Sequence, residues 1–471
     1  MFARARQTIA DLIAPKALST RRFDGAGGGR RWDARPSFGR VGAETLAASG
    51  PLRSRARYFA ANNPWAANGV SALVAGMVGA GIVPASAHPD PETRKAIGEA
   101  ITRWAKVADA DGRTDAFGIQ ALATRGLVVD GEAFIHLDTR PEGLRLRLLP
   151  PEMIDEADTR DLSDGGYVVA GVRFDASGQR IGYHVLKSRP TDVFASVGGS
   201  VFVPASDMIH IMVPLGAGQV RGVSWLAPIL LRLSELDLLE DALAVGVKIA
   251  AMHAGFLVDQ NGTGEPFEGD PADISLEPGT VRRLPQGYDI KFSTPQHAQQ
   301  TAEFVNHQIR AIAAGLGVPA HLVSGDLRDA NYGSLRAGMI AFRQKLEQHQ
   351  FGTLIPQACD PIFARAVTSL VLTGEIDASD FESAFADYTA AEHYPPPMPW
   401  LDPAKDMAAV REALDTGLLS RRQAVAERGY NIEALDAEIA ADREREARMG
   451  LTFTAAPKIA NDGGDVDDAA A

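Results

Sequence analysis

Two carboxylates, Asp130 and Glu132, flank Gly131 immediately before an expected strand that carries His136. Carboxylates close to a histidine could carry out general acid–base catalysis. No further catalytic partner lies at a fixed spacing from them, so we interpret the segment as a turn with a solvent-exposed edge. An α+β enzyme that uses Asp130, Glu132 or His136, joined to a helical partner-binding region, is the alternative hypothesis.

Glycines between Gly216 and Gly222 precede an expected helix, as in nucleotide-binding loops. Arg221 stands where a dinucleotide-binding motif needs its third glycine, and no Gly-Lys-Ser/Thr follows, so we expect a turn that leads into the helix. The ten histidines include no closely spaced pair that would bind a metal. Three of them lie in expected strands and are expected to be structural: His136, His184 and His210. The motifs therefore predict no cofactor, no metal and no catalytic residue.

A polar cluster follows an apolar helix after Pro319. It consists of Arg328, Asp329, Asn331, Tyr332 and Arg336. An irregular loop of this length in a compact protein is often functional. We therefore favour a functional loop over a plain connector here.

The chain has 471 residues, of which 45% are apolar and 23% charged, with a net charge of −13. The length allows about three domains. The single cysteine, Cys359, excludes disulfide frameworks and zinc sites with paired cysteines, and it suits a reducing compartment. No apolar run approaches the roughly 18 residues of a membrane span, and the first residues lack a secretory signal, so we expect no membrane partner.

Charge is distributed unevenly along the chain. The first 57 residues hold twelve basic and four acidic residues. We expect residues 1–50 to form a flexible basic arm, and residues 451–471 to form a disordered acidic tail. A DNA-binding regulator that uses the basic arm is a third hypothesis, and its DNA affinity would fall steeply with salt.

The apolar pattern predicts an α+β fold. Helical spacing over 51–80 and 90–110 is followed by short strand-like segments with a mostly antiparallel arrangement. These segments cover 131–137, 144–149, 167–174 and 183–186. Two long helices, over 225–256 and 294–319, flank a polar insert with strand-like pieces. An irregular loop over 320–333 and a helix over 334–350 come next, and the C-terminal part is helical with N-caps at Asp402 and Ser420.

Four segments carry a resemblance to a known family. They read RYFAANNPWA at 57–66, VGAGIVP at 78–84, QVRGVSWLAP at 219–228 and NYGSLR at 331–336. In this order they resemble the portal proteins of tailed phages, specifically the lambda-like portal family, over roughly residues 40–435. Gly333 departs from the serine that is more frequent in the family.

The resemblance implies a portal-type fold. Its parts are an antiparallel-sheet wing, long stem helices, a small α/β clip insert and a helical C-terminal region. The wing would span 51–224, the stem helices 225–256 and 294–319, the clip 257–293, the channel loop 320–333, the channel-side and wing helices 334–400, and the C-terminal crown 401–450.

The resemblance also implies a non-enzymatic function. The chain would form a ring, usually of twelve copies, at one capsid vertex of the virion, after assembly in the bacterial cytoplasm. Double-stranded DNA would pass through the ring during packaging and ejection, without sequence-specific binding. Arg328 and Arg336 would make weak phosphate contacts, and Asp329, Asn331 and Tyr332 would also face the DNA.

The same resemblance implies several protein partners. The clip would dock the large subunit of terminase and later the head–tail adaptor, while the major capsid and scaffold proteins would surround the ring. Candidate clip contacts are Glu265, Phe267, Arg282, Arg283 and Tyr288.

Overall fold

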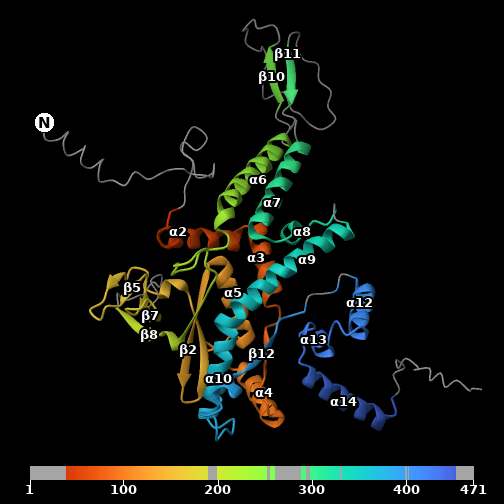
Figure 1. Cartoon of the computed structure of the whole chain (residues 1–471). Helices are drawn as coiled ribbons and strands as arrows, with labels where there is room; N and C mark the ends of the chain where they lie inside the picture. The colour runs from red at the N-terminus through yellow and green to blue at the C-terminus, as the bar shows by residue number, and fades with distance from the viewer. Residues whose placement is uncertain are drawn as a thin grey trace, which may run out of the picture.

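The computed structural model describes residues 39–188, 199–251, 255–259, 288–292, 298–328, 331–397, 400 and 402–451. Helices and antiparallel strands form one body, from which a pair of helices projects (Figure 1). The fold is therefore mixed α+β, as the sequence predicts. Among the described residues, no helix combines the length and the apolar composition needed to cross a bilayer.

The body begins with two consecutive helices, α2 (Val41–Asn62) and α3 (Pro64–Met77). Asn63 separates them, and its side-chain oxygen accepts a hydrogen bond from the amide of Ala66, with Pro64 in the first turn. Helix α2 starts nine residues before 50, the expected end of the flexible arm, so that expected boundary was wrong. Thr45 and Ser49 of α2 are already buried. Residues 1–38 of the expected arm lie outside the described residues.

A three-stranded antiparallel sheet in the order β3-β2-β9 forms the centre of the body. Its strands are β2 (Glu132–Arg140), β3 (Gly143–Leu149) and β9 (Met208–Met212). The central strand β2 pairs Phe134 with Leu149 on one side and with His210 on the other. Helices α4 (Pro91–Ala105) and α5 (Ala116–Val129) contribute buried aliphatic side chains to the same core.

A second antiparallel sheet, of five strands, lies beside the first. Its strands are β4 (Arg160–Asp161), β5 (Tyr167–Val169), β6 (Val172–Phe174), β7 (Arg180–Leu186) and β8 (Ser200–Pro204). The 3-10 turns η2 (Pro151–Met153) and η3 (Ala205–Asp207) connect the two sheets. A small core that contains Phe134, Tyr183 and Met208 packs between them. The predicted antiparallel pairing is confirmed.

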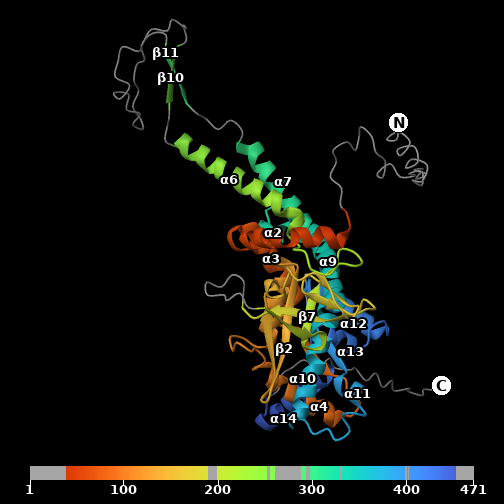
Figure 2. The same cartoon turned by 90° about the vertical axis from the view of Figure 1, so that its left-hand side faces the viewer.

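Two helices, α6 (Leu230–Ala251) and α7 (Ala298–Leu316), run side by side away from the body (Figures 1 and 2). Beyond their ends lies a two-stranded antiparallel hairpin, β10 (Gly255–Asp259) and β11 (Tyr288–Phe292). The order helix, strand-containing insert, helix follows the sequence prediction. The first helix is shorter than expected, because the 3-10 turn η4 (Ala227–Ile229) precedes it and β10 already begins at Gly255. Residues 294–297, where the predicted second helix begins, lie outside the described residues.

The segment after Pro319 is less irregular than expected. Residues Ala320–Ser324 form the short helix α8, so the prediction of a loop over the whole of 320–333 was wrong. Helix α9 (Tyr332–His349) continues without a break into the π-helix η6 (Gln350–Cys359) and then α10 (Asp360–Leu372). Gln357 in η6 accepts a hydrogen bond from the amide of Met212 and donates one to its carbonyl, which fastens the π-helix to the end of β9.

The C-terminal part consists of α11 (Phe385–Thr389), β12 (Ala391–Tyr394), α12 (Pro403–Asp415), α13 (Arg421–Ala426) and α14 (Ile432–Met449). Strand β12 pairs antiparallel with β1 (Val83–Ser86), so residues more than 300 positions apart meet there. The predicted caps at Asp402 and Ser420 are confirmed, and Gln423 completes the capping box. None of the described residues of α12, α13 or α14 is buried.

Candidate functional site

The short loop between α8 and α9 begins at Gly325, whose left-handed backbone (φ 67°) ends α8. Asp326 then receives hydrogen bonds from the Arg328 guanidinium, with Nη2 2.7 Å from Oδ2. These bonds lower the pKa of Asp326 to about 2. The Arg328 side chain remains 85% exposed. The loop therefore presents a solvated arginine whose charge is partly balanced by its own neighbour.

Asn331 is part of the start of α9 and not of a free loop. Its Oδ1 accepts a hydrogen bond from the Ser334 amide at 2.8 Å, while the Ser334 hydroxyl accepts one from the Asn331 amide at 3.3 Å. This reciprocal cap starts the helix at Tyr332. The asparagine among the predicted site residues therefore has a clear structural role.

Tyr332 and Arg336 meet one turn apart on α9. Arg336 Nη1 donates to the Tyr332 hydroxyl at 3.0 Å, and Nη2 donates to Asp406 Oδ1 at 3.2 Å. The hydrogen bond to Tyr332 and the charge of Asp406 raise the pKa of Arg336. Lys405 Nζ lies 6.0 Å from the centre of the Tyr332 ring. The pair thus joins α9 to α12, an association that sequence spacing does not predict.

Several predicted site residues lie outside the described residues: Asp329, Glu265, Phe267, Arg282 and Arg283. Tyr288 is the first residue of β11 and pairs with Asp259, the last residue of β10.

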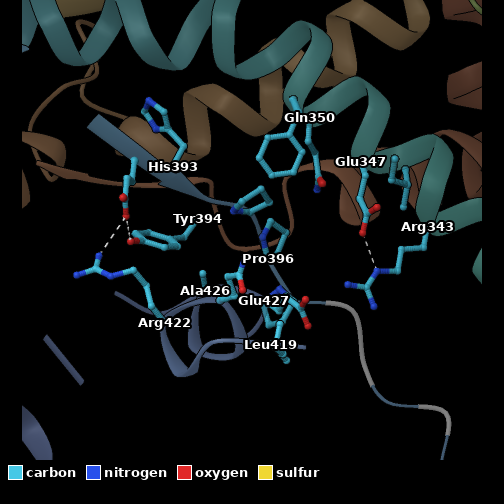
Figure 3. Close-up of a pocket in the computed structure, with 16 residues that line it drawn as sticks. Arg343, Glu347, Gln350, His393, Tyr394, Pro396, Leu419, Arg422, Ala426 and Glu427 are labelled. Carbon is cyan, nitrogen blue, oxygen red and sulfur yellow. Dashed lines mark hydrogen bonds and ion pairs between the residues drawn. The ribbon is translucent and has the colours of Figure 1, made fainter. Parts of the chain in front are cut away.

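A hollow of about 570 Å³ separates the body from the C-terminal helices (Figure 3). One wall is α9, where Arg343 Nε donates to Glu347 at 2.8 Å. The opposite wall joins β12 to α13, because Glu392 accepts from the Tyr394 hydroxyl and lies 3.8 Å from Arg422. Among these contacts, the one between Glu392 and Arg422 joins the body to the C-terminal helices.

A buried charged cluster was missed by sequence analysis. Glu132, which we expected at a solvent-exposed edge, is fully buried, so that prediction was wrong. Its Oε1 lies 2.7 Å from Arg221 Nη2, and its Oε2 accepts from the Gly222 amide at 2.8 Å. The ring nitrogen Nε2 of His210 lies 3.0 Å from Oε2. Each carboxylate oxygen thereby has a partner, either from the neighbouring strand β9 or from the turn before α6.

The electrostatics of this cluster fix its protonation state. Burial opposes ionisation of Glu132, but the charge of Arg221 and the hydrogen bond with His210 outweigh it, so the pKa of Glu132 lies well below its usual range. Burial lowers the pKa of His210, against the raising effect of Glu132. An inaccessible carboxylate whose pKa lies this far below the usual range is unsuited to exchange protons with a substrate.

The cluster also connects separate parts of the fold. Arg221 donates to the carbonyls of Ala170 and Pro151, at 3.0 and 2.9 Å, and so reaches the second sheet. Arg53 of α2 lies 2.7 Å from Glu156, which also lies 3.2 Å from Arg221. Nearby, the Arg57 guanidinium binds Asp130 and Glu152. Arg53, Glu132, Glu156 and Arg221 therefore form a clamp that holds α2, both sheets and the turn before α6 together.

Two glycines make this clamp possible. They are the feature of the sequence from which the buried cluster could have been predicted. Gly131 has φ 91°, and a Cβ there would lie 2.1 Å from the carbonyl carbon of Val223. A Cβ at Gly222 would lie 2.2 Å from the Gly131 carbonyl oxygen. The pairs Gly131-Glu132 and Arg221-Gly222 thus combine close backbone approach with opposite charges.

The sequence matches the family described as phage portal protein, lambda family, over residues 28–350, which is more than half of the chain. The chain belongs to the lambda family of phage portal proteins. A probable portal protein of Halomonas phage phiHAP-1 is 25% identical over 426 residues, which cover 85% of this chain and 81% of the relative.

The chain is also similar to chains in solved structures. The neck of a native GTA particle, computed with C12 symmetry, contains a chain that is 16% identical, with a TM-score of 0.43, and the match covers 88% of this chain and 99% of that one. An HK97-family phage portal protein from Corynebacterium diphtheriae is 14% identical, with a TM-score of 0.28, over 73% and 94% of the two chains.

Portal proteins are structural components of the virion. Membership of this family therefore confirms the expectation that the chain is not an enzyme. The geometry agrees, because the carboxylates of the enzyme hypothesis hold the portal subunit together: Glu132 binds Arg221 and Asp130 binds Arg57.

Proposed function

We propose that this portal protein closes into a ring of about twelve copies, at one capsid vertex, through which double-stranded DNA is packaged and ejected. The observation that carries the ring is an uncovered apolar stripe on α6. Leu231, Leu238 and Val245 are each more than half exposed and repeat every seven residues, which places them on one helix face. Such a regular aliphatic face favours a second helix as its partner.

The distal half of α6 has little covering from the described residues of its own chain. Between Leu236 and Lys248, the last α6 residue whose side chain is described, no residue is buried. A ring of heterologous contacts would cover this helix with the neighbouring copy, and it closes when the rotation between neighbours fits.

Acidic side chains on α6 support passage of DNA without tight binding. Glu235, Asp237, Glu240 and Asp241 outnumber Arg232 and Lys248 among its described residues. Tight nonspecific DNA binding requires several phosphate contacts from clustered cations. In this proposal Arg328, exposed and partly balanced by Asp326, makes a weak transient phosphate contact, whereas Arg336 mainly joins α9 to α12.

The ring is tested with a charge placed in the stripe. Leu238→Glu should shift native mass spectra of the purified full chain from closed rings to monomers or small open oligomers. Val107→Glu introduces the same charge at another exposed apolar residue, just after α4 at the end of the body opposite α6, and should leave rings intact. Rings that survive Leu238→Glu, with negative-stain images unchanged, would contradict the proposed role of the stripe.

In the same proposal, the β10–β11 hairpin and its connection form the clip, which docks the large terminase subunit and the head–tail adaptor, while the body contacts major capsid and scaffold proteins. Asp259 and Tyr288 are direct antiparallel partners, so an Asn-Gly turn can replace residues 260–287 and still close the hairpin. This replacement should retain rings but abolish co-sedimentation with terminase and adaptor. Undiminished binding of both would contradict docking through the clip.

A further inference from the structure

A cavity of about 290 Å³ lies where β1 and β12 meet α4 and α10, far from the projecting helices. Its walls are mainly apolar and include Ile82, Ile101, Trp104, Ala116, Ile362 and Phe363. Exposed residues at its rim, Val83, Thr102 and Lys106, leave a way in from solvent. An apolar cavity of about half this volume is sufficient to hold benzene.

One polar side chain in the cavity wall has an unused hydrogen-bonding atom. The His393 side chain is only 3% exposed, and its Nε2 lies 2.8 Å from Asp360 Oδ1. Its other ring nitrogen, Nδ1, is buried and has no hydrogen-bond partner among the described residues. Figure 3 shows the ring directed away from Tyr394 and from the hollow drawn there, and His393 also lines the 290 Å³ cavity.

The partner of Nε2 determines what Nδ1 can do. An ionised carboxylate only accepts hydrogen bonds, so Nε2 carries the hydrogen toward Asp360. Burial lowers the pKa of His393, against the opposing effect of Asp360, and so favours the neutral ring. Nδ1 of this tautomer is an acceptor, and it needs an N–H or O–H donor.

Two donors in the cavity wall, the Trp104 indole and the Gln120 amide, are engaged elsewhere and leave little for a water molecule. Trp104 Nε1 donates to the Leu144 carbonyl at 2.9 Å. Both ends of the Gln120 amide are engaged with the backbone of Ile82. A buried water normally needs two to four polar partners. An apolar molecule with a single donor matches this lining better than water does.

We propose that this cavity binds a small, mainly apolar molecule with one hydrogen-bond donor, which it gives to Nδ1 of His393. This site is independent of the proposed DNA conduit. A flat molecule of two fused rings would occupy the space between β12 and α4. Because His393 pairs with Pro84 across the β1–β12 ribbon, a bound ligand would brace the strand that leads to the C-terminal helices.

The test compares two isosteres by titration calorimetry on the full chain. Indole has an N–H donor, whereas benzofuran has nearly the same shape and lacks a donor. Indole should bind more tightly by about 2- to 10-fold, which corresponds to one net hydrogen bond. Equal affinities, or no measurable binding of either compound, would overturn the proposal.

Three variants test whether the compounds bind in this cavity. His393→Phe should retain binding but remove the preference for indole. Asp360→Asn changes a half-exposed residue, no longer fixes the histidine tautomer, and should also reduce the preference. Ala116→Phe fills the cavity and should abolish binding of both compounds. Indole binding that is unchanged in all three variants would show that the compound binds elsewhere and would overturn the assignment.

Discussion

Arg221 Nη2 lies 2.7 Å from Glu132 Oε1, and both side chains are almost completely inaccessible to solvent. A buried ion pair of this kind is costly to form but even more costly to break, because the remaining charge cannot return to water. In this portal subunit, Glu132 also accepts a hydrogen bond from the Gly222 amide and contacts the His210 ring. Arg221 in turn donates to the carbonyls of Ala170 and Pro151. It therefore determines how the two sheets and α2 fit together.

Glu132→Gln should lower the free energy of unfolding by about 3–5 kcal/mol, because Arg221 would remain charged and buried. Urea unfolding followed by circular dichroism measures the change. Asp436→Asn is the matched control, because it removes one partner of the exposed Arg421–Asp436 pair and should cost less than about 1 kcal/mol. The double variant Glu132→Gln/Arg221→Met should lose less than the sum of its single variants. Equal small losses at both sites would refute the clamp.

Mild acid should destabilise the subunit, in part through His210. Its folded pKa lies below the ordinary value of 6.5. Below about pH 6.5 the unfolded chain therefore binds a proton at this histidine that the folded chain excludes. The contribution of the neutral histidine to the free energy of unfolding is present in full above this pH and is lost as the pH falls.

The contribution of His210 can be separated from that of other histidines. His210→Gln retains a donor for Glu132 but removes the titration. Between pH 6.5 and 5.5 its unfolding free energy should fall less steeply than that of the unaltered chain, by up to about 1.4 kcal/mol per pH unit. Parallel pH profiles from urea unfolding would argue against a neutral buried His210.

Gly131→Ala should prevent stable folding, because the new Cβ would meet the Val223 backbone and the residue has a left-handed φ. Gly98→Ala offers the opposite case. Gly98 lies within α4, and apart from its chain neighbours and its own helix backbone no described atom lies within 4 Å of an added Cβ. The substitution should therefore stabilise by about 0.5–1 kcal/mol. Soluble yield and thermal melting compare the two variants. A normal melting temperature for Gly131→Ala would contradict the close approach described here.

Asn331→Ala should fray the first turn of α9 at a cost of about 1 kcal/mol, because it removes the cap that starts the helix. Hydrogen exchange of the amides at 333–335 should accelerate. Asn331→Asp keeps an accepting oxygen and should retain slow exchange. If the alanine and aspartate variants exchange alike, the cap does not start the helix.

The sequence predicted element types and order well where the apolar periodicity is strong. Leu233 and Leu236 of α6, and Ile312 and Leu316 of α7, are buried as the helical spacing predicts. The same spacing groups Phe304 with that face, yet Phe304 is half exposed because α7 has left the body at that point. Periodicity defines a face, but it does not show how far along the helix a partner follows.

Contacts between distant segments were the part that sequence reasoning could not supply. Along the sequence, most strands of the two sheets lie between Glu132 and Arg221, which are in direct contact in the fold. Arg336 meets Asp406 only because α12 folds back onto α9. The sequence shows charges and glycines at these positions but not which of them pair. The capping residues Asn331 and Ser420, whose partners lie three residues away, act locally, and only the role of Ser420 was predicted.

The clamp also has a consequence for synthesis on the ribosome. Its members enter the chain in the order Arg53, Glu132, Glu156 and Arg221, so Glu132 emerges long before its main counter-charge. Until Arg221 has left the exit tunnel, the first sheet cannot bury that carboxylate without a heavy electrostatic cost. The N-terminal half therefore cannot fold on its own during translation. Nascent chains that end before Arg221 should remain protease-sensitive.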